Sequence, residues 1–149
     1  MIGYNYGAKK KDRVIKIIKY FIKLSIIITA IGMVIILVFP TQLLEMFEVS
    51  KETTKLGIPA FRILSLGIIF AGINLVLSAT FQAFGNAIYS LIISLLRKVL
   101  IAMPIIYCLK EMFGLSIVWW AFTIAEVLTM VVAVIIYKKT FNKLLKQKY

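Results

Sequence analysis

The chain has 149 residues, of which 62% are hydrophobic, and it carries a formal net charge of +12. An ordinary soluble domain is nearer ~45–50% apolar, so a soluble core of this size could not bury so many apolar side chains. A single cysteine, Cys108, and the lack of histidine exclude an internal disulfide framework and the usual Cys/His zinc patterns. We therefore expect an integral membrane protein that contains no metal site and needs no cofactor.

The positive charges gather at the two ends of the chain. Seven of the eighteen basic residues lie between Lys9 and Lys23, and five more lie between Lys138 and Lys148. Basic residues that flank long apolar runs follow the positive-inside rule, which predicts that both termini face the cytoplasm. The same placement argues against nucleic acid as the partner and favours the lipid bilayer.

The first two membrane spans are expected at 13–39 and 57–83. Residues 24–44 hold no charge and are long enough to cross a hydrocarbon core of ~30 Å at ~1.5 Å per residue. Pro40 lacks a backbone donor and should end the first span. We expect a solvated external loop over 41–55, and Pro59 fits the first turn of the second span, where no backbone bond is lost.

The third and fourth spans are expected at 88–109 and 114–137. Gly85-Asn86 predicts the turn before the third span, which Pro104 should kink, and Gly114 marks a short outer turn. A basic cytoplasmic tail follows at 138–149. Four crossings place both termini on one side, in agreement with the basic clusters. The expected fold is an all-α, multi-pass bundle of four transmembrane helices in the cytoplasmic membrane.

Three stretches resemble the multidrug and toxic compound extrusion (MATE) family, especially its bacterial multidrug-export branch. They are IGYNYGA at 2–8, FRILSLGIIFAGINLVLSATFQAFG at 61–85 and GLSIVWWAFTIAE at 114–126. The resemblance implies twelve helices in two six-helix lobes that work by alternating access. Residues 1–12 would then be the cytoplasmic loop after the eighth helix, and the four spans would be helices nine to twelve of the second lobe.

This resemblance implies a fragment of a proton- or sodium-coupled antiporter that exports amphipathic organic compounds. Its partners would be the remaining transporter helices, whether the chain is a truncated gene product, an expressed fragment or one subunit of a split transporter. The alternatives are a lipid-linked oligosaccharide flippase of similar architecture and an autonomous small membrane protein that serves as an assembly or pore subunit. The chain offers no nucleophile with a base and no pair of carboxylates at depth, so we do not expect an enzyme.

Three charged residues, Arg97, Lys98 and Glu126, lie near the middle of the predicted spans, where a charge costs at least ~2.5–3.5 kcal/mol. Arg97 lies 12 residues below Leu109 and Glu126 lies 12 residues below Gly114, counted from the outer turn, so the two match in depth. We therefore predict an intramembrane ion pair, most simply a structural clamp and alternatively a coupling site for a proton or cation. Lys98, ~100° further around the helix, should point away from Glu126 and snorkel or face a wet cavity.

One face of the second span combines small and polar side chains. They are Gly67, Ala71, Asn74, Ser78 and Gln82. Close helix packing is the simpler explanation for the glycine and alanine, whereas packing and cavity lining explain the amides Asn74 and Gln82 about equally well, and Ser78 is a further candidate for cavity lining. Several relatives resemble one another in an acidic cation site on this helix, but here no Asp or Glu occurs between Glu52 and Glu111. Any coupling carboxylate in this chain must therefore be Glu126.

Overall fold

The fold is a bundle of long helices, seen in a computed structural model that describes residues 1–114 and 117–148. All regular structure in these residues is helical. The elements are α1 (Ile2–Gly7), α2 (Lys11–Val38), α3 (Pro40–Glu45), α4 (Lys51–Ala83), α5 (Ala87–Leu95), the π-helical η1 (Leu96–Ile101), α6 (Ala102–Phe113) and α7 (Val118–Lys148).

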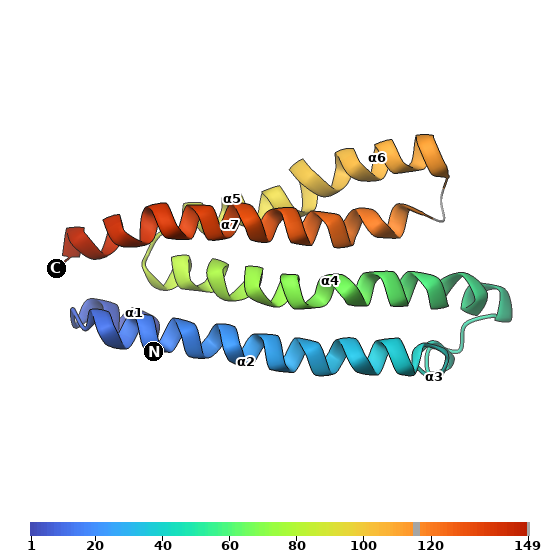
Figure 1. Cartoon of the computed structure of the whole chain (residues 1–149), viewed down its shortest axis with the longest axis horizontal. Coiled ribbons are helices and arrows are strands. Elements are labelled where there is room, and N and C mark those ends of the chain that lie inside the picture. Colours follow the sequence, from blue (N-terminus) through green and yellow to red (C-terminus); the bar gives the residue numbers. More distant parts are fainter. Residues whose placement is uncertain (115–116, 149) are drawn as a thin grey trace.

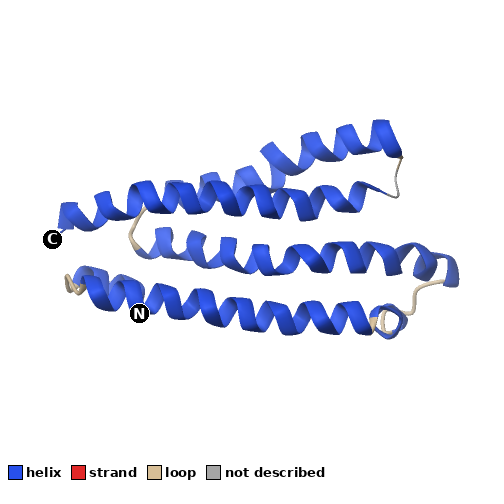
Figure 2. Ribbon diagram, viewed as in Figure 1, coloured by secondary structure: helices blue, strands red, loops and turns tan. Residues whose placement is uncertain are grey.

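In the described residues, four long helical segments, here called rods, lie side by side: α2, α4, the continuous α5–η1–α6 unit and α7 (Figure 1). Helix α4 lies between α2 and α7 and packs on both of them. Each rod is long and apolar enough to cross a membrane, so the prediction of an all-α bundle with four spans is confirmed. The two termini lie at the same end of the bundle, as Figure 2 also shows.

The second span begins earlier than the sequence predicted. Helix α4 starts at Lys51, where the Ser50 hydroxyl accepts a hydrogen bond from the Thr53 amide at 3.2 Å. The placement of Pro59 in the first turn was therefore wrong, because this residue lies inside the helix. The predicted loop over 41–55 is also shorter, since α3 occupies Pro40–Glu45 and Pro40 begins this helix after α2 has ended at Val38.

The third rod changes direction ahead of Pro104. Residues Leu96–Ile101 form the π-helix η1, after which α6 diverges from the axis of α5 (Figure 1). A proline lacks the amide that would bond the carbonyl one turn earlier, and its ring crowds that turn. Wide π turns are a known way for a helix to absorb such a defect, and they often occur at functional sites. Arg97 and Lys98 both lie in η1.

Small residues let α4 approach its two neighbours closely. A Cβ added to Gly72 would lie 2.6 Å from the Ser25 hydroxyl oxygen of α2, and a Cβ added to Gly67 would lie 3.3 Å from the Thr123 Cα of α7. The Thr123 hydroxyl also donates to the Ile63 carbonyl at 2.8 Å. Because the hydrophobic effect between helices is absent in lipid, such close packing and polar contacts hold spans together.

The end of the bundle that holds the termini is the best packed. The 1–12 segment is more than a loop there, since α1 buries Tyr6 against Phe84 with ring centroids 4.6 Å apart. The rings of Tyr137 and Phe141 stack at 4.6 Å in the same region, and α7 continues into the basic segment as far as Lys148. By contrast, α2 exposes a run of aliphatic side chains from Ile26 to Val38, as expected for a lipid-facing helix.

Candidate functional site

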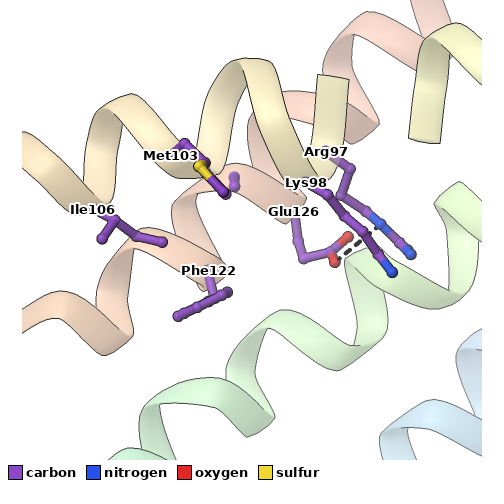
Figure 3. Close-up of a pocket in the computed structure, with 8 residues that line it drawn as sticks. Arg97, Lys98, Met103, Ile106, Phe122 and Glu126 are labelled. Carbon is purple, nitrogen blue, oxygen red and sulfur yellow. Dashed lines mark ion pairs between the residues drawn. The ribbon is translucent and has the colours of Figure 1, made fainter. Parts of the chain in front are cut away.

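The charged residues of the third and fourth spans meet in the middle of the bundle. The Arg97 Nε atom lies 3.6 Å from the Glu126 Oε1 atom, and the two side chains are 27% and 20% exposed (Figure 3). Helix α7 supplies the carboxylate and η1 supplies the guanidinium. The structure thus brings together the two residues that were predicted to pair because they lie at the same depth. They make one long contact and lack the two parallel hydrogen bonds of a bidentate pair.

Asn74 of α4 is the second partner of the same carboxylate. Its side-chain Nδ2 donates to the Glu126 Oε2 atom at 3.0 Å and to the Glu126 backbone carbonyl at 3.1 Å. The side chain of Asn74 is fully buried, and its Oδ1 atom has no hydrogen-bond partner. Glu126 is therefore held from two sides, by a cation on Oε1 and by an amide on Oε2. This contact was not predicted from the sequence, where Asn74 was a candidate residue of helix packing or of a cavity wall.

Two pockets meet at Glu126. The larger has a volume of about 390 Å³ and lies between η1–α6 and α7; its charged lining is Arg97, Lys98 and Glu126. Its apolar lining includes Met103, Ile106 and Phe122. The smaller, of about 230 Å³, lies between α4 and α7 and is bordered by Gly67, Ala71 and Glu126. Glu126 therefore borders a pocket on each side of α7.

Lys98 does not point away from Glu126 as expected. It lines the larger pocket together with Arg97, and the two side chains lie next to each other in Figure 3. The four-carbon stem of a lysine is long enough to bring its ammonium alongside the neighbouring guanidinium. Among the residues that the structure describes, Lys98 makes no ion pair. The two expectations for this residue, snorkelling and a wet cavity, stay predictions.

Ser78 and Gln82 point toward α5. The hydroxyls of Ser78 and Ser90 are 2.6 Å apart, and the Gln82 side-chain amide donates to the Ser90 hydroxyl at 2.7 Å. Both bonds tie α4 to α5 beside the Gly85-Asn86 turn, where Gly85 has a φ of +78°. Within this chain their first role is helix packing, and a role in lining a substrate cavity stays a prediction. The described residues include no cluster of three His, Cys, Asp or Glu side chains that could hold a metal ion.

A bundle of apolar spans that places a carboxylate, an arginine and an amide together at mid-depth is typical of membrane transport proteins. The MatE family model matches residues 1–108, and the chain belongs to that family. It is 28% identical over 138 residues to the multidrug export protein MepA of Staphylococcus saprophyticus, covering 91% of this chain and 30% of that protein. It is 25% identical to MepA of Staphylococcus haemolyticus, covering 99% of this chain and 32% of that protein.

A solved structure titled "protein A" has the same arrangement of helices. Its TM-score is 0.82 at 32% sequence identity, and the match covers 91% of this chain and 30% of that one. The chain therefore spans about a third of the length of the relatives it matches.

Proposed function

We propose that this chain forms part of a cation-coupled exporter of amphipathic organic compounds across the cytoplasmic membrane. Membership of the MatE family and the multidrug-export names of the MepA relatives support this function. The remaining two thirds of such a transporter would be its partners. Alternating access would move this group of helices against the other lobe around a site near the middle of the membrane.

The observation that carries the proposal is the environment of Glu126. It is the only acidic residue after Glu111, and it lies between Arg97 and Asn74 where η1, α4 and α7 meet. Because Arg97 makes a single contact of 3.6 Å with Glu126, a proton or another cation could take the place of its guanidinium. A proton or sodium ion on the carboxylate would weaken the attraction to Arg97, while Asn74 would keep the side chain in place. The structural clamp is the competing role for the same pair.

The walls of the larger pocket suit an amphipathic substrate. Met103 and Phe122 offer an adaptable thioether and an aromatic face, and the charged groups lie at one end of the pocket (Figure 3). A change in the charge of Glu126 would alter the electrostatics of this pocket directly. Ion binding and substrate binding would thus be coupled through one side chain.

We further propose that both termini face the cytoplasm. The end of the bundle that holds the termini presents exposed basic residues, which include Lys9, Lys10, Lys138 and Lys139. The opposite end carries Lys51, Lys55 and Lys110 together with several acidic side chains. The excess of positive charge at the first end supports its cytoplasmic placement.

The test is ion flux through the complete transporter, in which this chain would be joined by its partner helices, reconstituted in vesicles. Adding an amphipathic drug should drive a proton or sodium flux against the direction of drug movement. Glu126→Gln should abolish this flux, while Glu111→Gln, a matched change at an exposed position near the outer turn, should leave it intact. Undiminished coupling in a folded Glu126→Gln protein would show that Glu126 has only the structural role of a clamp. The absence of ion flux in the unmodified protein would disprove cation coupling.

A further inference from the structure

The larger pocket has a charged end and an apolar end. Figure 3 shows Arg97, Lys98 and Glu126 grouped together, with Met103, Phe122 and Ile106 on the other side of the cavity. A volume of about 390 Å³ falls within the range of small-molecule sites, ~300–1,000 Å³. Such a pocket would suit a ligand with one polar end and one apolar end.

The charges at the polar end do not balance. Arg97 is paired with Glu126, and Lys98 has no ion-pair partner among the residues that the structure describes. Lys98 is 11 residues beyond Ala87 and 15 residues before Phe113, so it lies near the middle of the span. An unpaired cation is unfavourable at that depth, and this residue needs an anionic partner or water. Its exposed side chain leaves the ammonium free to meet a ligand.

We propose that this pocket binds a single-chain amphiphile with one negative charge, of the fatty-acid type. The carboxylate head would contact the Lys98 ammonium and the guanidinium nitrogens of Arg97, and the alkyl chain would lie against Met103, Ile106 and Phe122. At ~30 Å³ for each water-sized group, the cavity holds on the order of a dozen such groups. That size favours a chain of medium length and is too small for a phospholipid with two acyl chains.

A cationic head group fits the same pocket poorly. Arg97 and Lys98 would both repel it, and each oxygen of the Glu126 carboxylate already has a partner, Arg97 on Oε1 and Asn74 on Oε2. The net charge of +1 at the polar end, from two cations and one carboxylate, therefore favours an anion. This inference concerns equilibrium binding and does not rest on the proposed export function, because binding is measured without an ion gradient.

The experiment uses the full-length protein in nanodiscs of zwitterionic lipid. A photoreactive dodecanoate is crosslinked to the protein, and the labelled peptide is located by mass spectrometry. Dodecanoate and dodecyltrimethylammonium, which have the same chain length and opposite charges, then compete for labelling. We expect label on the pocket residues Met103, Ile106 or Phe122 and roughly tenfold stronger competition by dodecanoate, as for one charge-assisted contact.

Three variants identify the group that selects the charge. Lys98→Gln should remove the preference for dodecanoate, and Lys98→Arg should keep it because the positive charge remains. Lys110→Gln, a matched loss of charge on α6 away from the pocket, should leave the preference unchanged. Equal or stronger competition by the ammonium compound, or labelling outside the pocket, would overturn the proposal. So would a marked loss of thermal stability in Lys98→Gln, because Lys98 would then be paired with a carboxylate of the protein itself.

Discussion

The side-chain amide of Asn74 donates to both the carboxylate and the backbone carbonyl of Glu126, at 3.0 and 3.1 Å. One fully buried residue of α4 therefore fixes the position of the acidic side chain and the height of α7 relative to α4. The arrangement also leaves the Asn74 Oδ1 atom unpaired, which is a cost that ordinary helix packing does not require.

Asn74→Ala should lower the free energy of unfolding by about 1–3 kcal/mol, because Glu126 Oε2 loses a donor in a low-dielectric setting. Thermal unfolding in a mild detergent measures the change. Thr129→Val serves as the control, since it also alters a fully buried polar side chain of the same interior. The Thr129 hydroxyl has no partner, so its removal should be neutral or stabilising. Equal losses in the two variants would contradict the role assigned to the Asn74 amide.

The number of spans could be predicted from the sequence because long charge-free runs and basic flanks report directly on the bilayer. The residues at which the helices begin and end were harder to predict from the sequence. Pro59 suggested the start of the second span, but the Ser50 cap places that start at Lys51. A cap at the polar end of a helix competes with proline as a start signal, and hydrophobicity does not distinguish the two.

The meeting of Arg97 and Glu126 was predictable because depth along adjacent antiparallel spans can be counted in residues. The contact with Asn74 was not, because it depends on which side of α7 packs against α4, a lateral relationship that counting residues along a span does not give. Lys98 differed from expectation for a related reason. An ideal helical wheel places it away from Arg97, whereas η1 is π-helical and the lysine stem is flexible.

Close packing between α2 and α4 should be sensitive to one added methyl group. Gly72→Ala places a Cβ 2.6 Å from the Ser25 hydroxyl and 2.8 Å from the Thr29 methyl, so these side chains or the helices must shift, and stability should fall by about 1–3 kcal/mol. Gly32→Ala on α2 is the matched control, because no atom lies within 4 Å of the new Cβ. It should be neutral or should stabilise the helix by up to ~1 kcal/mol. Thermal unfolding that ranks the variants in the opposite order would refute the close approach at Gly72.

The proposed topology predicts that α3 lies outside the cell. Cys108 is exposed, so it is first replaced by serine. A cysteine at the exposed position of Gln42 should then react with a membrane-impermeant maleimide added to intact spheroplasts. A cysteine in place of Lys138 should react only after the membrane is opened. The reverse pattern of labelling would show that the basic ends face outward.

The ion pair predicts a coupled response in a double-mutant cycle. Glu126→Gln or Arg97→Gln alone leaves one charge without its partner and should lower the free energy of unfolding by about 1–3 kcal/mol, since both side chains retain some exposure. The double variant should lose less than the sum of the two, and thermal unfolding of all four proteins gives the interaction energy. Lys110→Gln is the control, because Lys98 lines the same pocket as the pair and Lys110 does not.

Exchanging the two residues distinguishes charge pairing from the full geometry of the site. Arg97→Glu combined with Glu126→Arg keeps an opposite pair at the same depth, which alone would restore stability. In the unmodified protein the Asn74 Nδ2 group donates to the carboxylate, and a guanidinium at position 126 offers it no acceptor. Asn74 could present its free Oδ1 atom to the guanidinium only by turning its amide over, which gives up the bond to the backbone carbonyl of residue 126. The exchanged protein should therefore remain less stable than the unmodified protein, and adding Asn74→Asp, which supplies a charged acceptor, should recover part of the loss. Full recovery by the exchange alone would show that Asn74 contributes nothing to the position of Glu126, and strict additivity of the single effects would show that Arg97 and Glu126 do not interact.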